Sequence, residues 1–599
     1  MKIALAQLNY RVGDFEANVA KILDAIEKAR SAKADLAVFA ELSVCGYPPR
    51  DFLEFDDFIR RCERAVVTIA AECHGIAAIV GAPSVNPAEK GKPLYNTAWF
   101  LADGKILGKF HKTLLPNYDV FDEYRYFEPN RLPYALAEYK ECRFAVTICE
   151  DLWNIADDPL YVRNPMDELA PLNPDVIINI AASPFHYEQR QTRRDVLSRN
   201  AMKYGLPVIY VNQMGGQTEL IFDGGSMVVD ASGNVLAELK EFEEDLRIIE
   251  IQSSKFKVQS SKISDESSAN HQISTLSHQP ISTLSHQHIS TLSHQHISTL
   301  SHQHISTSAH QHISTLTSPE TIRLIYSALA LGIRDYFGKM GFSKAILGLS
   351  GGIDSAVTLV LAAEALGTEN VRAILLPSQF SSRHSIDDAL ALARNLGVSY
   401  DIIPIEEAYH SMEKTLHPLF AGLPFDIAEE NIQARLRAVI LMALSNKFGY
   451  ILLNTSNKSE AAVGYGTLYG DMCGGLSALG DVYKTQVYAL AGHINREQEI
   501  IPRNSILKPP SAELRPGQKD SDSLPGYDIL DRILYRYIEQ RIGPEELIAE
   551  GFDEKTVRKA LKLVNTSEYK RFQTPPILRV SPKAFGMGRR MPIVGKYLS

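Results

Sequence analysis

A glycine-rich loop between an apolar strand and a helix carries the residues that are best suited to chemistry. Ala345 to Leu349 is apolar, the loop reads Ser350-Gly-Gly-Ile-Asp354-Ser355, and an apolar helix pattern continues to Leu366. Two glycines let the backbone turn tightly and approach a ligand, and the helix N-terminus offers unpaired N–H groups to a phosphate. Because Asp354 is acidic where a phosphate would lie, we expect a bridging Mg²⁺.

This loop is not the lysine-containing P-loop, because no Gly-Lys-Ser/Thr follows it. It resembles the Ser-Gly-Gly-x-Asp-Ser signature of the ATP pyrophosphatases, which cleave ATP between the α- and β-phosphates and leave an adenylated substrate for a nitrogen or sulfur nucleophile. The alternative is an ordinary strand-to-helix turn. The resemblance implies that ATP contacts the residues around the loop: Gly348, Leu349, Ser350, Gly351, Gly352, Ile353, Asp354 and Ser355.

Length and composition predict a soluble protein of two or more domains. The 599 residues exceed what one hydrophobic core supports, and 45% hydrophobic with 22% charged residues is typical of globular proteins. A net charge of -9 disfavours general nucleic-acid binding, and no apolar run reaches the roughly 18–20 residues that span a bilayer. The chain starts directly in a strand pattern without a signal peptide, and its six cysteines form neither a disulfide framework nor a C-x-x-C motif. We therefore expect a cytoplasmic protein.

An eight-residue repeat divides the chain. The unit Ser-His-Gln-His-Ile-Ser-Thr-Leu recurs five times with small changes from Ser277 to Leu316, and ten of the 17 histidines lie in or beside it. This period places Ile and Leu on opposite faces of a strand and spreads them around a helix. We interpret residues 253–318 as a flexible low-complexity linker between units at 1–252 and 319–599, with metal binding by the histidines as the alternative.

The N-terminal unit alternates strand and helix patterns, which predicts an α/β layered domain. Strands are expected at 2–8, 36–40, 76–81, 97–101, 143–148, 176–180 and 208–211, and a helix at 15–30. Glu41 and Cys149 follow two of these strands and Lys112 lies on a connecting segment, where α/β proteins keep their sites. A cysteine nucleophile needs a base and a nearby cation, which Glu41 and Lys112 would supply. A lone cysteine at a strand end is also often structural.

Flanking residues make this trio resemble the nitrilase, or carbon–nitrogen hydrolase, superfamily. They are Phe39-Ala-Glu41-Leu, His111-Lys112-x-Leu-Leu-Pro-Asn117 and Ile148-Cys149-Glu-Asp-Leu-Trp153. The resemblance covers roughly residues 1–250 and implies an α-β-β-α sandwich that cleaves amides through a thioester on Cys149. Glu123 would either position Lys112 or lie on the surface.

The family's glutamine-dependent members imply contacts to the glutamine substrate from Tyr118 and Ser183. Those members carry a basic residue six positions after the serine, where this chain has Gln189 followed by Arg190. Arg190 or Arg194 would replace the missing basic group if the loop shifts. We therefore expect a glutamine site formed by Tyr118, Ser183, Gln189 and Arg190.

The C-terminal unit repeats the strand–loop–helix pattern, which predicts a doubly wound parallel sheet. Strands are expected at 371–376, 400–405 and 450–453, and helices at 431–448 and at 385–396, the latter capped by Ser385. After the last strand, Thr455 offers a hydroxyl, and Glu460 offers an oxygen ligand that could share one Mg²⁺ with Asp354. Lys484 follows as a partner for phosphates. The proline-rich, charged segment 508–527 is either a solvated loop or a lid over ATP.

In this order the segments look like the NAD synthetase family over residues 319–599. Asn454-Thr-Ser-Asn-Lys-Ser-Glu460, Pro510-Ser-Ala-Glu-Leu-Arg-Pro516 and Arg571-Phe-Gln-Thr-Pro-Pro576 match closely. That family adenylates deamido-NAD⁺ on its nicotinate carboxylate, and ammonia then displaces AMP. The resemblance implies that deamido-NAD⁺ contacts Asn431, Glu460 and Lys583, and that ATP contacts Thr455, Lys484 and Ser511. It also suggests a homo-oligomer, an octamer being one option, in which Lys583 could reach a neighbouring subunit.

An amidase joined to an ATP pyrophosphatase predicts that ammonia made from glutamine in the first unit amidates adenylated deamido-NAD⁺ in the second, giving NAD⁺, AMP and pyrophosphate. Since free ammonia is mostly ammonium at neutral pH, we also expect a sheltered path between the sites. GMP synthetase and asparagine synthetase combine similar activities, but the first uses a Cys-His-Glu amidotransferase and the second needs a cysteine where this chain has Lys2. A non-catalytic scaffold built around the histidine repeat is the remaining alternative.

Overall fold

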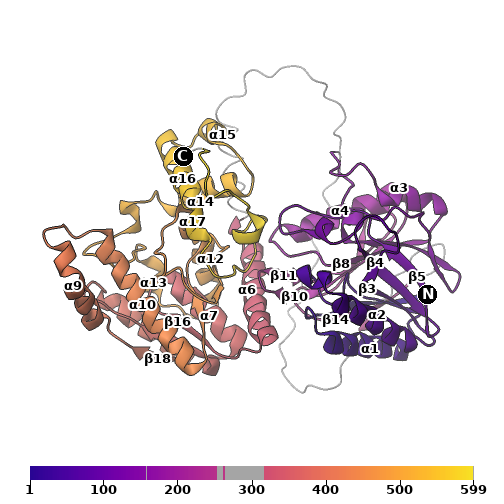
Figure 1. Ribbon diagram of the computed structural model, residues 1–599, viewed down its shortest axis with the longest axis horizontal. Coiled ribbons are helices and arrows are strands. Elements are labelled where there is room, and N and C mark those ends of the chain that lie inside the picture. Colours follow the sequence, from indigo (N-terminus) through magenta and orange to yellow (C-terminus); the bar gives the residue numbers. More distant parts are fainter. Residues whose placement is uncertain (157, 252–260, 263–315, 598–599) are drawn as a thin grey trace.

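The computed structural model describes residues 1–156, 158–251, 261–262 and 316–597. Two lobes lie side by side, the N-terminal one in indigo to magenta and the C-terminal one in pink to yellow (Figure 1). Nearly all of the predicted linker lies outside the described residues, so the linker and the domain boundaries stay predictions. Within the described ranges, no helix is both long enough and apolar enough to cross a membrane.

The N-terminal lobe contains two sheets. The first has the strand order β15 (Ser261–Lys262), β14 (Asp245–Glu250), β1 (Lys2–Gln7), β2 (Leu36–Val38), β3 (Ala77–Val85), β4 (Leu94–Ala102) and β5 (Lys105–His111). The second has the order β13 (Val235–Glu238), β12 (Met227–Val229), β9 (Val208–Asn212), β8 (Val176–Ala181), β7 (Cys142–Ile148) and β6 (Ala137–Tyr139). A separate hairpin is formed by β10 (Met214–Gln217) and β11 (Leu220–Asp223).

Alternating side chains stack these two sheets. Ile3 and Leu5 of β1 belong to the core shared with β7, β8 and β9, whereas Ala4 and Ala6 pack under two helices on the other face. Those helices are α1 (Phe15–Ser31) and α2 (Asp56–Ala71), and the second sheet is covered by α3 (Pro165–Leu169) and α4 (Gln189–Tyr204). The predicted α-β-β-α sandwich is therefore confirmed.

The C-terminal lobe is built on a parallel sheet of five strands. Their order is β18 (Ser399–Ile402), β17 (Val371–Leu375), β16 (Ala345–Gly348), β19 (Ile451–Asn454) and β20 (Leu476–Ser477). The chain enters at the central strand and extends the sheet first on one side and then on the other. This confirms the predicted doubly wound sheet and creates a crevice at the carboxyl ends of the central strands.

Helices surround this sheet and form the rest of the lobe. They are α6 (Pro319–Met340), α7 (Ile353–Leu366), α8 (Arg383–Leu396), α9 (Glu406–Phe420), α10 (Ile427–Phe448), α11 (Lys458–Val463), α12 (Lys484–Ile494), α13 (Arg503–Leu507), α14 (Tyr527–Ile538), α15 (Pro544–Ala549), α16 (Glu554–Thr566) and α17 (Glu568–Arg571). The first of them, α6, lies between the lobes and packs against β10 and β11 (Figure 1).

The cap of α8 differs from the prediction. The helix begins at Arg383, and Ser382 is its cap, with Ser382 Oγ accepting a hydrogen bond from Ser385 N at 3.2 Å. Ser385 lies inside the first turn and is buried, so the prediction that it caps the helix is wrong. The Ser382-x-x-Ser385 spacing offers two hydroxyls, and the cap goes to the one that precedes the first helical turn.

Candidate active sites

Cys149 lies directly after β7, which lies next to the edge strand β6 in the second sheet. It begins a short 3-10 helix, Cys149–Leu152, and its φ of 42° falls in the left-handed region that non-glycine residues rarely adopt. The residue is 5% exposed. Strained backbone of this kind persists where the surrounding fold enforces it, and it is concentrated at functional sites.

Lys112 joins the two acidic residues near this cysteine. Its Nζ lies 2.7 Å from Glu41 Oε1 and 2.8 Å from Glu123 Oε2, and all three side chains are buried. Asn96 Nδ2 and Ala182 N donate to the Glu41 carboxylate at 2.7 and 3.0 Å. A buried charge is tolerated when it is paired and hydrogen-bonded. Glu123 is thus buried against Lys112 and is not a surface residue.

Burial controls protonation at this site. It raises the pKa of the Cys149 thiol well above the ordinary value; Glu41 raises that pKa further, and Lys112 opposes both. Burial also raises the pKa of Glu123 to about 7, against the attraction of Lys112. The resting thiol is therefore neutral and needs a base. Glu41, a buried carboxylate held by Lys112, Asn96 and Ala182, is the candidate for that base.

Two predicted glutamine contacts lie around the same turn. Tyr118 is 40% exposed, and its OH donates at 2.9 Å to Oε1 of Glu150, the residue after Cys149. Ser183 is buried, and its Oγ accepts a hydrogen bond from Gln189 Nε2 at 3.0 Å. The structure thus ties Tyr118 to the cysteine turn and Gln189 to Ser183.

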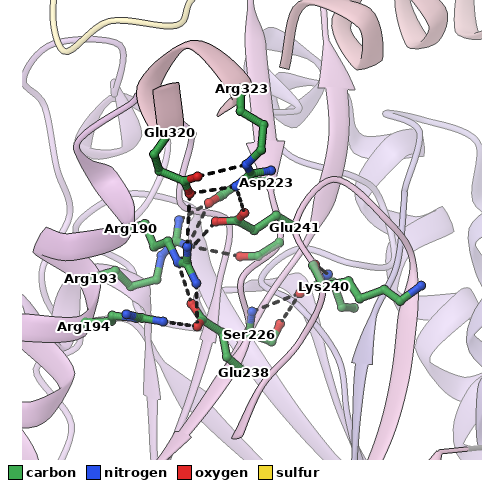
Figure 2. Close-up of polar contacts among 12 residues, drawn as sticks. Arg190, Arg193, Arg194, Asp223, Ser226, Glu238, Lys240, Glu241, Glu320 and Arg323 are labelled. Atoms are coloured by element: carbon green, nitrogen blue, oxygen red, sulfur yellow. Dashed lines mark hydrogen bonds and ion pairs between the residues drawn. The ribbon is translucent and has the colours of Figure 1, made fainter. Parts of the chain in front are cut away.

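Arg190 points to a different set of partners. Its guanidinium faces three carboxylates (Figure 2), at 3.0 Å from Glu238, 3.3 Å from Glu241 and 3.6 Å from Glu320. Arg194 also pairs with Glu238. Both arginines considered as replacements for the family's basic residue are therefore engaged by an acidic cluster, and none of these carboxylates belongs to the predicted glutamine site.

A cavity of about 320 Å³ lies at the carboxyl ends of the central strands of the C-terminal sheet. The predicted residues that line it are Gly348, Leu349, Ser350, Gly352, Ile353, Asp354, Ser355, Thr455, Glu460, Lys484 and Ser511. Gly351 is absent from this lining. Its φ is +77°, and a Cβ added there would lie 2.1 Å from Ser385 O, so Gly351 lets the loop pack tightly against α8.

Lys484 bridges two carboxylates in this cavity. Its Nζ is 2.5 Å from Asp354 Oδ2 and 3.2 Å from Glu460 Oε1, and Asn457 Nδ2 donates to Asp354 Oδ1 at 2.8 Å. Burial raises the pKa of Glu460 to about 7 despite the attraction of Lys484. Burial would lower the pKa of Lys484, but Asp354 and Glu460 raise it. One ammonium between both carboxylates shows that they are close enough to share a single cation.

This pair of carboxylates fits a nucleotide-bound Mg²⁺. Among the described residues, no group of three or more His, Cys, Asp or Glu side chains is arranged to hold a metal ion. Mg²⁺ that binds together with a nucleotide needs one or two carboxylates, because phosphates and water supply the other oxygens. Asp354 and Glu460 meet that requirement.

The segment 508–514 covers one side of the cavity. Glu513 holds it to the N-terminus of α8: its carboxylate accepts from Ser382 N at 3.1 Å, Ser382 Oγ at 2.9 Å and Ser385 Oγ at 2.8 Å. Glu513 has a φ of 49°, in the left-handed region. A cavity wall latched by three hydrogen bonds favours the lid interpretation of this segment over a solvated loop.

Two predicted dinucleotide contacts do not line this cavity. Asn431 of α10 accepts a hydrogen bond from Thr467 Oγ1 at 2.7 Å. Lys583 Nζ lies 3.1 Å from Oδ1 of Asp119, a residue of the N-terminal lobe. Of the three residues predicted to contact deamido-NAD⁺, Glu460 alone lines the cavity.

Comparisons with known proteins match both lobes. The family models "Carbon-nitrogen hydrolase" and "NAD synthase" match residues 2–258 and 325–574. The glutamine-dependent NAD(+) synthetase of Synechocystis sp. is 43% identical, over 99% of this chain and 98% of its own. The Thermotoga maritima enzyme of the same name is 41% identical, over 100% and 99%. The chain belongs to the glutamine-dependent NAD⁺ synthetases. It is a ligase, which excludes a non-catalytic scaffold.

Solved structures agree with this assignment. The glutamine-dependent NAD⁺ synthetase of Acinetobacter baumannii, determined in complex with ADP, is 37% identical to this synthetase with a TM-score of 0.71, over 99% of this chain and 98% of its own. The Cytophaga hutchinsonii enzyme has a TM-score of 0.76 at 21% identity, with the same coverage, and shows the shared fold.

Several residues of the two sites of this synthetase could not be assigned a role from the sequence. Asn457 lies inside the Asn454–Glu460 motif and Glu513 inside Pro510–Pro516, so both were within recognised segments but had no assigned role. Asn96 lies on β4 and contacts Glu41 across the fold. Its position in an apolar strand carried no signal, because the contact depends on how distant segments pack.

Proposed function

We propose that Glu41, Lys112 and Cys149 form the centre at which this synthetase hydrolyses glutamine. Glu41 takes the thiol proton of Cys149, and the sulfur attacks the carboxamide carbon. Lys112 stabilises the oxyanion, and Glu41 returns the proton to the leaving nitrogen, so ammonia leaves and a thioester remains. Water, deprotonated by Glu41, then attacks the thioester carbon, which releases glutamate and restores the thiol.

Glutamine recognition in this proposal uses Tyr118, Ser183 and Gln189. The amide of Gln189 donates one N–H group to Ser183 Oγ, and its second N–H group would be offered to the substrate carboxylate. Arg190 contributes its charge to this carboxylate from a distance, since its direct partners are glutamates. Because Gln189 is neutral where the family's glutamine-dependent members carry a basic residue, we expect this enzyme to bind the glutamine carboxylate more weakly than they do.

The second centre of the proposal is the cavity around Asp354, Glu460 and Lys484. Lys484 would bind the triphosphate, with Thr455 and Ser511 beside it, and Asp354 and Glu460 would hold Mg²⁺. The ion would neutralise charge on the phosphates and leaving pyrophosphate. The nicotinate carboxylate of deamido-NAD⁺ attacks the α-phosphorus and expels pyrophosphate. Ammonia then attacks the acyl carbon of this adenylate, and AMP leaves.

Assembly and location complete the proposal. Asn431 and Lys583, which lie outside the cavity, would contact the dinucleotide where it extends beyond ATP, in a homo-oligomer in which a neighbouring subunit can take part. The ammonia would travel between the lobes along a sheltered path. We assign the enzyme to the cytoplasm, because all six of its cysteines are free thiols, which suits a reducing compartment.

The buried Glu41–Lys112–Glu123 group next to a neutral Cys149 carries the proposal, and Cys149→Ala tests it. We expect this variant to make NAD⁺ and AMP from ammonium, ATP, Mg²⁺ and deamido-NAD⁺, but not from glutamine. Cys142→Ala, at the opposite end of β7, is the matched control and should use both nitrogen sources. Glutamine-dependent synthesis by Cys149→Ala would refute the assignment of the nucleophile.

A further inference from the structure

A chain of polar contacts links the turn that carries the nucleotide site to the glutaminase lobe, with Lys458 at its centre. Lys458 is the first residue of α11, in the turn that also carries Thr455 and Glu460 of the nucleotide cavity. Its side chain is fully buried, at 0% exposure, and it does not line the cavity. A lysine is almost never buried without full pairing. The partners of Lys458 are therefore protein groups and not ATP.

Four groups surround the Lys458 ammonium. Its Nζ lies 2.7 Å from Glu539 Oε1 and 2.9 Å from Asp481 Oδ1. It also donates to Ser581 Oγ at 2.7 Å and to Lys583 O at 3.0 Å. Burial would lower the pKa of Lys458, but Asp481 and Glu539 raise it, so the ammonium stays charged. An ammonium held in this way cannot move without its carboxylates.

Glu539 connects this cluster to the glutaminase lobe. Tyr187 OH donates to Glu539 Oε2 at 2.5 Å, across the boundary between the lobes. Tyr187 N also donates to Val580 O at 3.0 Å. Tyr187 lies between Ser183 and Gln189, the two residues joined by a hydrogen bond in the predicted glutamine site.

The segment 579–583 makes the second connection. Asp481 accepts hydrogen bonds from Val580 N at 2.8 Å and from Ser581 N at 2.7 Å, which fixes the segment beside Lys458. From the same segment, Arg579 and Lys583 both pair with Asp119, at 2.6 and 3.1 Å. Asp119 is adjacent in sequence to Tyr118, the other predicted glutamine contact.

We propose that Lys458 is a positioning residue through which the nucleotide site and the glutamine site control one another. This inference rests on the site assignments proposed above. A shift of the 454–460 turn on nucleotide binding moves the ammonium, and Glu539 and segment 579–583 follow it. Glu539 and segment 579–583 then reposition Tyr187 and Asp119, which are close in sequence to the predicted glutamine contacts. Glutamine is then hydrolysed fastest when an acceptor is ready.

Tyr187→Phe and Lys458→Met test this chain of contacts at the lobe boundary and at its centre. The first removes one hydroxyl from the lobe boundary, and the second removes the central charge. The readouts are glutamate formed per NAD⁺, and the glutaminase rate with and without ATP, Mg²⁺ and deamido-NAD⁺. We expect both variants to lose roughly fivefold of the nucleotide stimulation, at the low end of typical coupling between sites, and to release more glutamate per NAD⁺.

Arg571→Met is the matched control. Arg571 is also buried and also contacts α11, donating to Ala461 O at 3.1 Å and to Ala462 O at 2.7 Å. Unlike the contacts of the Lys458 cluster, its hydrogen bonds stay within the C-terminal lobe. We expect it to lose stability and to keep the stimulation and the glutamate-to-NAD⁺ ratio of the unaltered enzyme.

Unchanged stimulation and an unchanged ratio in Tyr187→Phe would overturn the proposal, even if Lys458→Met fails to fold. Equal uncoupling by Arg571→Met would also overturn it, because general loosening of α11 would then be the cause. Failure of the underlying site assignments looks different: Cys149→Ala would then still consume glutamine.

Discussion

Replacing Glu123 with glutamine tests how Lys112 is positioned, because it removes one charge and almost no volume. Lys112 Nζ lies 2.9 and 2.8 Å from the two Glu123 oxygens and 2.7 Å from Glu41. The substitution replaces one charge-assisted hydrogen bond from Lys112 with a hydrogen bond to a neutral amide oxygen. A hydrogen bond to a charged group contributes about 1.5–3 kcal/mol. If that contribution is lost in the transition state, the glutaminase kcat/KM falls by roughly 10–150-fold.

The pH dependence of the glutaminase reaction provides a second, independent signature. Burial raises the pKa of Glu123 to about 7, so its carboxylate is neutral below that pH and ionised above it. Glutamine has a neutral side chain and imitates the protonated form. We therefore expect the wild-type rate to rise as pH increases through about 7. The Glu123→Gln variant should lack that step and approach the wild-type rate only at low pH.

The assay measures glutamate release between pH 5.5 and about 8.5, a span that brackets this titration. NAD⁺ synthesis from ammonium serves as the folding control, because it uses the other lobe. If Glu123→Gln kept the wild-type glutaminase rate and pH profile, Lys112 would be positioned by Glu41 alone and the reasoning would be refuted. A simultaneous loss of the ammonium-dependent reaction would indicate a folding defect in place of a local effect.

Three further outcomes follow from the nucleotide cavity. Lys484→Met removes the cation between two carboxylates. NAD⁺ synthesis from either nitrogen source should therefore fall by roughly 10²–10³-fold in steady-state assays, while unstimulated glutaminase activity remains. Gly351→Ala forces a Cβ to within 2.1 Å of Ser385 O, and thermal unfolding should occur at a lower temperature, with loss of ATP binding. Glu513→Ala releases three hydrogen bonds of the lid, so the KM for ATP should rise by about tenfold, and limited proteolysis should cut 508–519 faster.

The sequence predicted those parts of the fold that depend on local pattern. The apolar run 345–349, followed by two glycines and an apolar helix pattern, predicted the strand–loop–helix of the nucleotide site. The strand and the helix in the structure agree with that prediction. The fold class of both lobes followed from the alternation of strand and helix patterns and from family resemblance, whereas the order of the strands in each sheet is known from the structure. The site residues on the ends of these strands could therefore be named from sequence.

Contacts between distant segments could not be predicted in this way. Nothing in the polar sequence around Tyr187 indicates that its hydroxyl meets Glu539, 352 residues further along the chain. Arg190 is a similar case. It is adjacent to Gln189, which suggested that it could take the place of the basic residue. The structure pairs it instead with Glu238 and Glu320, which are contributed by other segments.

One arrangement recurs three times in the described parts of this enzyme: a buried lysine between two carboxylates. Lys112, Lys484 and Lys458 each pair with two acidic residues, which leaves one excess negative charge at each place. In the two candidate active sites, burial raises the pKa of one acid to about 7, and the second carboxylate adds to that rise. A ligand can relieve the cost of burying this excess negative charge. An oxyanion or a phosphate can draw the lysine away while a proton or Mg²⁺ neutralises the acid. Lys458 has no ligand to meet. Its excess charge is held by a tyrosine hydroxyl from the other lobe, which is why we assign it to communication and not to chemistry.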